Sequence, residues 1–394
     1  MKIIAPKSYN SCTIGLPPSK SVVNRAIVLY SLYRKSTKSV QEDNSVSIKD
    51  LLDQKYSGQP LCDDISVMQY LADNIDKTDT FSVQASGTAM RFGTALFAVT
   101  EGTRTITGTA RLCERPIKPL VDALRQLGAN IEYLKEEGYP PLKIHGNPQM
   151  KGGELSIRGD ISSQFISALL MISPSTQNGI HLNIEGEQVS QSYINMTNEM
   201  IRRVIEMNET PELEPDWSAA AFWYEISTLC GVTFNLPGLK PDSVQGDKIC
   251  DRIFKLVNEY KKEDGIFEYD FQDCPDLAQA VIVTCCVKQI PFKFIGLKTL
   301  KIKETDRIVA LKTELQKLGY CLNISNETIE FDGKRNDCTN DTVSIETYKD
   351  HRMAMAFAPC AIKFGSINIL DPDVVNKSYP TFWNDLQKAG FILS

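Results

Sequence analysis

Basic and hydroxyl side chains stand at the beginnings of several apolar stretches that have helical spacing. Ser19-Lys20-Ser21, Ser86-Gly87-Thr88 and Lys303-Glu304-Thr305-Asp306-Arg307 each lead into such a stretch. The first turn of a helix offers unpaired N–H groups and the positive end of the helix dipole, and both attract anions. Cations placed there repel one another unless an anion lies among them. These residues therefore predict a ligand with more than one phosphate or carboxylate group.

Each motif taken alone also has a simpler interpretation. Around Lys303 and Arg307, the neighbouring Glu304 and Asp306 could neutralise the charges on a solvated helix face. We favour the ligand because the pattern recurs at seven predicted helix starts. The basic and hydroxyl residues at these starts include Lys20, Ser21, Arg25, Thr88, Arg91, Arg115, Ser162, Ser163, Lys303, Arg307 and Arg352.

Carboxylates at the same places could supply acid–base chemistry. Asp276 follows Cys274-Pro275 at a predicted helix start, and Glu304 stands beside Lys303. A carboxylate within hydrogen-bond reach of a substrate hydroxyl can act as a general base. Asp276 could instead be a helix cap, which is the commonest role of Asp at this position.

Several familiar catalytic motifs are missing from the sequence. It has neither the Gly-rich loop of P-loop nucleotide-binding proteins nor the Gly-x-Gly-x-x-Gly of dinucleotide-binding folds, and no Gly-x-Ser-x-Gly. Its three histidines are far apart, and its eleven cysteines are scattered without zinc-binding spacing. We therefore expect no metal and no cofactor, and we interpret the cysteines as reduced and mostly buried.

Length and charge limit the class of protein. The 394 residues suggest two or three domains, and 43 basic against 49 acidic residues give a net charge of −6. This balance argues against broad binding to nucleic acid or to an anionic membrane surface. The N-terminus lacks the apolar stretch of a signal peptide, and no apolar run approaches the ~20 residues of a membrane span. We expect a cytoplasmic monomer without nucleic-acid or membrane partners.

The helix starts recur at similar intervals in the two halves of the chain. They are 27 and then 47 residues apart from Thr88 through Arg115 to Ser162, and 29 and then 45 residues apart from Asp276 through Thr305 to Asp350. Two helices also end alike, in Leu-x-x-Leu-Gly at Gly128 and at Gly319. These agreements predict a duplicated α/β chain of strand–helix units, with chance spacing as the alternative. Expected strands include 131–134, 142–144, 154–157 and 181–184.

Proline-rich segments mark the expected domain boundaries. The segment from Pro211 to Pro215 precedes a fresh apolar helix, and Leu16-Pro17-Pro18 separates the first strand, expected around Ile3 to Ile14, from the rest. The polar stretch 34–80 predicts no detailed structure.

Several strings of the sequence taken together carry a family resemblance. Lys303-Glu304-Thr305-Asp306-Arg307 and Asp350-His351-Arg352-Met353-Ala354-Met355 are together highly specific. They are accompanied by Ser19-Lys20-Ser21 with Asn24-Arg25-Ala26, Gly87-Thr88-Ala89-Met90-Arg91, Glu114-Arg115-Pro116-Ile117, Ser162-Ser163-Gln164-Phe165, Ser190 with Tyr193, Pro275-Asp276, and Lys377 with Pro380. In these strings and their order, the chain resembles the 5-enolpyruvylshikimate-3-phosphate synthase (3-phosphoshikimate 1-carboxyvinyltransferase) family.

The resemblance implies an α/β fold of two domains with an inverse α/β barrel-like architecture. Each domain would contain three βαβαββ repeats, with the active site in the cleft between the domains. Residues 1–17 and 215–394 would form the domain with Asp276, Lys303–Arg307, Arg352 and Lys377. Residues 18–214 would form the inserted domain with Lys20, Arg25, Gly87, Arg115 and Ser162–Gln164.

The resemblance also implies the reaction of the family in the shikimate pathway, which leads to chorismate and the aromatic amino acids. Phosphoenolpyruvate would donate its enolpyruvyl group to the 5-hydroxyl of shikimate 3-phosphate and release phosphate. The catalytic residues would be Asp276, Glu304, Lys20 and Lys303. Shikimate 3-phosphate would be bound by Lys20, Ser21, Arg25, Ser162, Ser163, Gln164, Ser190, Tyr193, Asp276 and Lys303. Phosphoenolpyruvate would be bound by Lys20, Gly87, Thr88, Arg115, Gln164, Arg307, Arg352 and Lys377.

The chain departs from the usual family pattern at a few positions. Ala85 stands where Asn is usual, Phe92 where Pro is frequent, and Thr299 where Asn is frequent. Ala85 and Phe92 are expected beside the phosphoenolpyruvate pocket, so they bear on the response to the inhibitor glyphosate. Cys62-Asp63-Asp64-Ile65 resembles the start of a family helix in an altered context.

Two alternatives remain open from the sequence. The related UDP-N-acetylglucosamine enolpyruvyl transferases usually have Lys-Asn at the first helix start and a loop cysteine five residues before their Arg-Pro. This chain has Lys20-Ser21, and Cys113 lies two residues before Arg115. A catalytically silent anion-binding protein on the same fold is the other alternative, and the presence of Asp276 and Glu304 argues against it.

Overall fold

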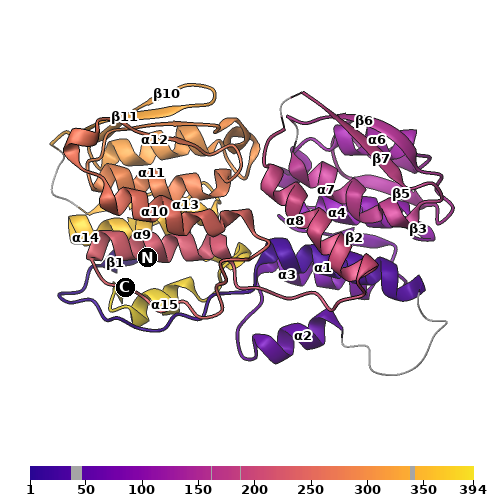
Figure 1. Ribbon diagram of the computed structural model, residues 1–394, viewed down its shortest axis with the longest axis horizontal. Helices are drawn as coiled ribbons and strands as arrows, with labels where there is room; N and C mark the ends of the chain where they lie inside the picture. The colour runs from indigo at the N-terminus through magenta and orange to yellow at the C-terminus, as the bar shows by residue number, and fades with distance from the viewer. Residues whose placement is uncertain (37–46, 161, 187, 338–341) are drawn as a thin grey trace. The chain divides into compact units, whose positions relative to one another are not determined.

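The computed structural model describes residues 1–36, 47–160, 162–186, 188–337 and 342–394, without the side chains of 34–36. The chain divides into two compact units, which are drawn in Figure 1. Unit 1 contains Met1–Ser19 and Glu214–Ser394, and unit 2 contains Lys20–Leu213. In unit 1, the Ser19 N–H donates to the Glu214 carbonyl oxygen at 2.8 Å, so the segments flanking the insertion are paired.

One repeat of unit 1 has the complete βαβαββ order. Strand β8 pairs in parallel with β9, and β9, β11 and β10 continue the sheet with antiparallel pairs. The elements of this repeat are β8 (Phe267–Asp270), α11 (Ala278–Val287), β9 (Phe292–Ile295), α12 (Arg307–Lys317), β10 (Tyr320–Ile324) and β11 (Ile329–Arg335).

A second repeat of unit 1 is completed by the N-terminus of the chain. Strand β1 (Lys2–Ile4) lies between β13 and β14 and pairs antiparallel with both. This pairing explains why the N-terminal residues belong to the same unit as the C-terminus (Figure 1). The other elements are β12 (Val343–Ile345), α13 (His351–Phe357), α14 (Ala361–Phe364), β13 (Ser366–Ile369), α15 (Phe382–Lys388) and β14 (Ile392–Leu393).

The third repeat of unit 1 has its helices but forms no regular strands. Helices α9 (Trp217–Cys230) and α10 (Cys250–Glu259) are joined by a segment whose one β-bridge pairs Asn235 with Thr13. Pro237, Gly238 and Pro241 interrupt this segment, and such residues prevent a continuous strand ladder. The first strand, expected around Ile3 to Ile14, is shorter than predicted, because β1 covers only Lys2–Ile4.

Unit 2 also contains one complete βαβαββ repeat, with the sheet order β2-β3-β5-β4. Its elements are β2 (Thr80–Ser82), α4 (Gly87–Ala98), β3 (Gly102–Thr107), α5 (Ala110–Cys113), α6 (Lys118–Gln126), β4 (Asn130–Tyr133) and β5 (Leu142–Gly146). The next repeat has one parallel pair of strands and two helices, followed by a π-helical turn. These elements are β6 (Gly153–Arg158), α7 (Ser163–Ile172), β7 (Ile180–Glu185) and α8 (Gln191–Ile201).

The beginning of unit 2 is helical. Helix α1 (Lys20–Ser36) is followed by α2 (Ile48–Lys55) and α3 (Asp63–Asp73). The last two helices lie within the polar stretch for which the sequence predicted no detail, and 37–46 lie outside the described residues. The Ser47 side chain accepts a hydrogen bond from the Asp50 N–H, and the Asp50 side chain accepts one from the Ser47 N–H. These two bonds form a capping box at the start of α2.

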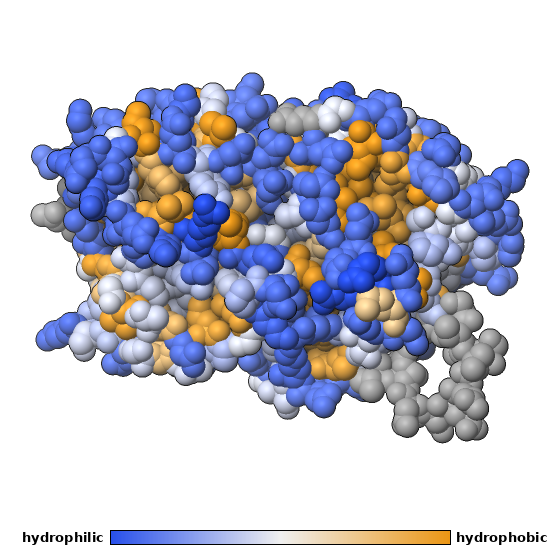
Figure 2. Space-filling view, in the orientation of Figure 1, coloured by the Kyte–Doolittle hydropathy of each residue, from blue (hydrophilic) through white to orange (hydrophobic). Residues whose placement is uncertain are grey.

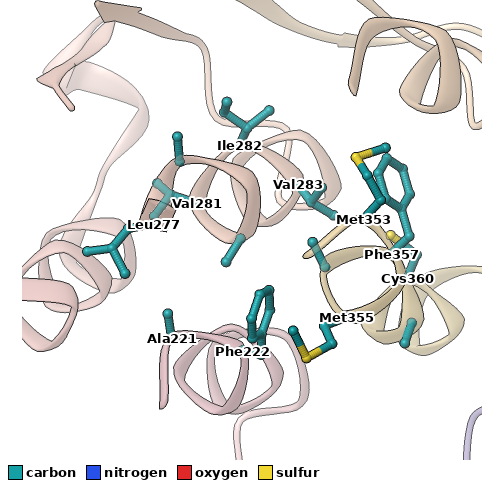
Figure 3. Packing of buried hydrophobic residues seen from close by; sticks show 14 of the residues in the cluster. Ala221, Phe222, Leu277, Val281, Ile282, Val283, Met353, Met355, Phe357 and Cys360 are labelled. Carbon is teal, nitrogen blue, oxygen red and sulfur yellow. The ribbon is translucent and has the colours of Figure 1, made fainter. Parts of the chain in front are cut away.

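Helices buried on all sides form the centre of unit 1. Every residue of α11 and α13 is buried, so neither helix has a solvent-facing stripe. Phe222 of α9, Val283 of α11 and Met355 of α13 lie around the space between the three helices (Figure 3). The charged starts of α12 and α13 are therefore fixed by a rigid apolar core.

The structure confirms the predicted α/β class and the expected strands at 131–134, 142–144, 154–157 and 181–184, with ends that differ by at most two residues. The similar helix ends are also real, because Gly128 and Gly319 have φ of 102° and 88° directly after α6 and α12. This left-handed conformation favours glycine and ends a helix. Polar side chains cover much of the face shown in Figure 2. None of the helices in the described parts of the chain has the length and apolar character needed to cross a membrane.

Candidate active site

The starts of three helices meet in unit 1 and bring their charged residues together. The 3₁₀ turn Pro275–Leu277 leads into α11, Asp306 caps α12, and Asp350 caps α13. The Asp350 carboxylate accepts a hydrogen bond from the Arg352 N–H at 2.9 Å. We call the resulting group the Asp276 cluster, which consists of Asp276, Lys303, Glu304, Arg307, Asp350, Arg352 and Lys377.

Asp276 is surrounded by three cationic side chains. Its Oδ1 lies 2.9 Å from Arg307 Nη1 and 3.5 Å from Lys303 Nζ. Its Oδ2 accepts a hydrogen bond from Arg352 Nη2 at 3.1 Å. Guanidinium groups from two helices thus fix the carboxylate, whose side chain retains 15% exposure. A carboxylate that is oriented but still accessible is suited to accept a proton.

Arg307 links the carboxylates of the cluster. Its Nε donates to Asp350 at 2.6 Å, and its Nη2 donates to Glu304 at 2.9 Å. Burial alone would lower the pKa of Arg307, but Asp350, Glu304 and Asp276 reverse this effect and raise it. Lys377 Nζ lies 2.8 Å from the other Glu304 oxygen. Arg307 is therefore permanently charged and holds three acidic side chains in place.

These contacts correct two expectations about the Lys303–Arg307 segment. Lys303 and Glu304 precede the helix, which begins at Arg307, so Lys303 and Arg307 are not neighbours on one helix face. The alternative of a solvated face is also wrong, because the Arg307 side chain is only 2% exposed. Asp306 separates the two parts of the segment by capping the helix through the N–H groups of Ile308 and Val309.

Asp247 is a fourth carboxyl group near this cluster, and the sequence analysis did not identify it. It is buried, and the Ser218 hydroxyl donates a hydrogen bond to it. Burial raises the pKa of Asp247 to about 6, with a further contribution from Asp276 and an opposing one from Arg352. Asp247 follows Gln245-Gly246 at the start of a 3₁₀ turn, a signal too common to indicate a site.

In unit 2, Lys20 connects the first turns of α1 and α3. Its Nζ lies 3.4 Å from Asp64 Oδ2, and the two side chains are 16% and 4% exposed. Asp64 belongs to the Asp-Asp helix start, and its partner Lys20 lies 44 residues earlier. The ion pair with Asp64 fixes the position of the Lys20 ammonium group, although the lysine side chain is flexible.

Arg25 is buried between helices of unit 2. Its Nε donates to Thr197 Oγ1 at 2.7 Å, and its Nη2 donates to Ser167 Oγ at 3.0 Å. The guanidinium carbon lies 5.3 Å from the ring centroid of Phe92 and 5.9 Å from that of Tyr193. Burial lowers the pKa of Arg25 to about 10, because the hydrogen-bonding partners that enclose it are neutral. The predicted role of Arg25 in binding shikimate 3-phosphate stays a prediction.

Gly87 lies against two guanidinium groups at the start of α4. A Cβ atom at this position would lie 2.6 Å from Arg91 Nη1 and 2.8 Å from Arg115 Nη1. Arg91 also donates to the Gly87 carbonyl oxygen at 2.9 Å. Beside them, Gln164 Nε2 donates to Thr88 Oγ1 at 3.1 Å and joins the starts of α7 and α4. The structure therefore groups four of the predicted ligand-binding residues.

The remaining predicted site residues occupy helix starts in unit 2. Ser162 caps α7 by accepting from the Gln164 N–H at 3.4 Å, and Ser163 is the first residue of that helix. Ser21 lies in the first turn of α1, and its carbonyl oxygen accepts from Arg25 Nη1 at 2.9 Å. Ser190 has a left-handed φ of 57° immediately before α8, which contains Tyr193.

Phe92 packs on a predicted ligand of shikimate 3-phosphate. Its ring lies against the Arg25 guanidinium group, and Phe92 is completely buried on α4. The expectation that Phe92 borders the phosphoenolpyruvate pocket stays a prediction. Within the described residues, no group of three or more His, Cys, Asp or Glu side chains is arranged to bind a metal ion.

The comparisons with known proteins show the family of the chain. The family model of EPSP synthase (3-phosphoshikimate 1-carboxyvinyltransferase) matches residues 4–212 and 206–386. A 3-phosphoshikimate 1-carboxyvinyltransferase of Bacteroides fragilis is 42% identical over an alignment 421 positions long, which covers 99% of this chain and 98% of the relative. One from Haemophilus influenzae is 34% identical, with 98% of each chain covered.

The fold is also shared with solved structures. An EPSP synthase from Acinetobacter baumannii superposes with a TM-score of 0.71 at 19% identity, covering 100% of this chain and 99% of its own. The family resemblance expected from the motifs is confirmed by these matches along the full chain. This chain belongs to the EPSP synthase (3-phosphoshikimate 1-carboxyvinyltransferase) family.

Proposed function

We propose that this protein transfers the enolpyruvyl group of phosphoenolpyruvate to the 5-hydroxyl of shikimate 3-phosphate and releases phosphate. Membership of the family supports this reaction. The observation that carries the proposal is the position of Asp276, whose carboxylate is oriented by Arg307, Arg352 and Lys303 at 2.9, 3.1 and 3.5 Å. A proton acceptor among cations suits a reaction between two anionic substrates.

The reaction can be written with balanced steps. A proton adds to the methylene carbon of phosphoenolpyruvate, and the 5-hydroxyl oxygen bonds to its C2 while Asp276 accepts the hydroxyl proton. The resulting tetrahedral intermediate then breaks its C2–O bond to phosphate and loses a proton from the methyl group, which restores the double bond. We assign the carbon-bound proton to Glu304 together with Lys20 or Lys303. Arg307 and Lys377 hold the Glu304 carboxylate in position at 2.9 and 2.8 Å.

Both units supply residues to this reaction in our proposal. Unit 2 would bind shikimate 3-phosphate through Arg25, the helix-start serines and Tyr193. The family resemblance assigns polar side chains of each unit to phosphoenolpyruvate, and most of them are cationic. These side chains are Lys20, Arg115 and Gln164 in unit 2, and Arg307, Arg352 and Lys377 in unit 1.

Release of inorganic phosphate tests the reaction. The purified full chain is given phosphoenolpyruvate with shikimate 3-phosphate, with UDP-N-acetylglucosamine, or alone. We expect phosphate release with shikimate 3-phosphate only. Release with the UDP-sugar instead would identify the related transferase, and no release in any mixture would indicate a catalytically silent anion-binding protein.

A pair of lysine variants tests the site assignment. Lys377→Met removes an ammonium group 2.8 Å from Glu304, with a side chain that is 12% exposed. We expect the KM for phosphoenolpyruvate to rise about tenfold or more, as for loss of a charge-assisted contact. Lys388→Met is the control, because Lys388 pairs with Asp385 at 2.7 Å and is 59% exposed. Equal effects of the two variants would contradict the assignment of Lys377.

A further inference from the structure

A buried glutamate on α12 contacts the segment that leads into α13. The Glu314 side chain is fully buried, and it lies two turns after Arg307 on the same helix. Its Oε1 accepts a hydrogen bond from the Tyr348 hydroxyl at 2.7 Å, and its Oε2 accepts from the Glu346 N–H at 3.0 Å. A buried carboxylate without donors would be costly, so these bonds are needed in the folded state.

The contacted segment has an unusual backbone. Tyr348 and Lys349 have φ of 53° and 56°, so two consecutive residues other than glycine are left-handed. Each such residue costs about 1 kcal/mol or more and persists only where its surroundings enforce it. Both residues lie directly before Asp350. We call residues 346–350 the Tyr348 strap.

The strap ends at the residue that organises the Asp276 cluster. The Asp350 N–H donates to the Thr347 carbonyl oxygen at 2.8 Å, which closes a turn within the strap. The Asp350 carboxylate then accepts from Arg307 Nε at 2.6 Å and from the Arg352 N–H at 2.9 Å. A change in the strap would therefore displace Asp350, which is a hydrogen-bond partner of both Arg307 and Arg352.

We propose that Glu314 is a positioning residue that fastens the Tyr348 strap and thereby sets Arg307 and Arg352 for binding the anionic substrate phosphoenolpyruvate. Arg307 and Glu314 both lie on α12. This helix therefore contacts Asp350 through Arg307 and Tyr348 through Glu314. The substrate assignment rests on the proposed function, whereas the geometric connection does not. Burial and the hydrogen bond to Glu314 raise the pKa of Tyr348, so its hydroxyl remains a donor at physiological pH.

Two variants remove the connection in different ways. Glu314→Gln keeps the size of the side chain but replaces one acceptor atom with an N–H₂ group, and Tyr348→Phe removes only the hydroxyl donor. We expect each to raise the KM for phosphoenolpyruvate about fivefold or more, while the KM for shikimate 3-phosphate changes by less than about threefold. The double variant should be no worse than Glu314→Gln, because both changes break one connection.

A third donor to the same carboxylate provides a matched control. Lys317 Nζ lies 2.6 Å from Glu314 Oε2, but its side chain is 39% exposed and does not belong to the strap. Lys317→Met should leave both KM values unchanged. Leu315→Ala removes buried apolar contacts next to Glu314 and should lower the melting temperature without raising the KM for phosphoenolpyruvate. An equal rise in this KM in either control would overturn the proposal.

Hydrogen exchange separates this inference from the proposed function. In Glu314→Gln and Tyr348→Phe, we expect faster amide exchange across 346–352 than in the wild-type protein, and weaker binding of inorganic phosphate by calorimetry. A wild-type protein without enolpyruvyl transfer would defeat the proposed function but leave these two measurements intact. Unchanged exchange and phosphate binding in Tyr348→Phe would defeat the inference, even if Glu314→Gln failed to fold.

Discussion

The Arg352 side chain binds both the main chain and the side chain of Asp276. Arg352 Nη1 donates to the Asp276 carbonyl oxygen at 3.1 Å, and Nη2 donates to Oδ2 at 3.1 Å. The Arg352 side chain is itself only 3% exposed. One guanidinium group therefore fixes the turn before α11 and the direction of the carboxylate. The proposed base has little freedom to rotate, which is the condition for efficient proton transfer.

The first prediction concerns Asp276→Asn. The amide keeps the shape of the side chain but cannot accept a proton in the same way, so we expect kcat to fall about 100-fold or more. Binding of phosphoenolpyruvate, measured by calorimetry, should not weaken, because the substitution removes a negative charge beside Arg307, Arg352 and Lys303. Asp306→Asn is the control, since Asp306 caps α12, and it should leave kcat nearly unchanged. An unchanged kcat in Asp276→Asn would remove this residue from the role of base.

The second prediction concerns Gly87→Ala. The added methyl group would lie within 2.8 Å of guanidinium nitrogens of Arg91 and Arg115, which are flexible ends that can move aside. We therefore expect the melting temperature to stay the same, because alanine is also favoured in a helix. The displaced guanidinium groups should raise the KM for phosphoenolpyruvate about tenfold or more. Unchanged kinetics would show that these arginines do not bind this substrate.

The third prediction concerns Phe92→Leu. The aromatic ring lies 5.3 Å from the Arg25 guanidinium carbon, and leucine would remove this cation–π contact while keeping an apolar side chain. We expect the KM for shikimate 3-phosphate to rise about threefold to tenfold, with the KM for phosphoenolpyruvate nearly unchanged. Phe97→Leu on the same helix is the control for loss of a buried ring, although it also contacts Arg104. The opposite selectivity in Phe92→Leu would place Phe92 beside phosphoenolpyruvate, as the sequence comparison first suggested.

The fourth prediction concerns the pH dependence that Lys303 imposes. Burial lowers the pKa of Lys303 below its ordinary value of 10.5, and Arg307 and Arg352 contribute in the same direction. Asp276 and Glu304 oppose the shift. The side chain is 27% exposed, so solvent limits the effect. As the pH rises, Lys303 should therefore lose its charge before an ordinary lysine does.

Lys303→Arg tests this expectation because a guanidinium group stays protonated throughout the accessible pH range. We expect the alkaline decrease of kcat/KM for shikimate 3-phosphate to move to higher pH in this variant, even if the maximal rate is lower. Lys301→Arg is the matched control, since Lys301 is bound to Asn326 at 2.7 Å outside the cluster. If kcat/KM decreased at the same alkaline pH in the wild type and in Lys303→Arg, the role of Lys303 as a cation would be contradicted.

Much of the fold was predictable because its signals are local. Asp306, Asp350 and Ser162 cap helices where the sequence places them, and Gly128 and Gly319 end helices through positive φ. These effects depend on a few neighbouring residues, so the chain reveals them without a partner. The order of strands and helices follows from the same signals.

The partners of the site residues could not be predicted in this way. Arg307 binds Asp350 across 43 residues, and Arg25 binds Thr197 across 172 residues. Such pairs depend on how helices pack, which helix caps and hydrophobic periodicity do not specify. The sequence therefore indicated cations that would bind an anionic ligand. The structure shows that some of them are already paired with carboxylates of the protein, namely Lys20, Lys303, Arg307, Arg352 and Lys377. The lack of regular strands around Pro237 could not be predicted either, because proline can end a strand or merely border it.

A buried acid outside the Asp276 cluster contributes to the change of stability with pH. Glu225 of α9 is completely buried, and burial raises its pKa well above the ordinary value. The nearby Thr284 hydroxyl opposes this shift only in part, because it donates its proton to the Ala280 carbonyl oxygen at 2.7 Å. Cys285 and Cys360 are the other polarisable groups close to the carboxyl. Glu225 therefore stays protonated in the folded state under conditions that ionise it in the unfolded chain.

The fifth prediction follows from this difference in protonation. Below the unfolded pKa of about 4.5 both states hold the proton, and above it only the folded state does, so the free energy of unfolding should fall as the pH rises. The decrease should approach about 1.4 kcal/mol per pH unit and end once the pH exceeds the folded pKa. Glu225→Gln cannot ionise, so urea denaturation between pH 5 and 8 should show a stabler protein whose advantage grows with pH. Glu268→Gln, at an exposed position of β8, should follow the wild type. Parallel pH profiles for Glu225→Gln and the wild type would mean that Glu225 is ionised within the core.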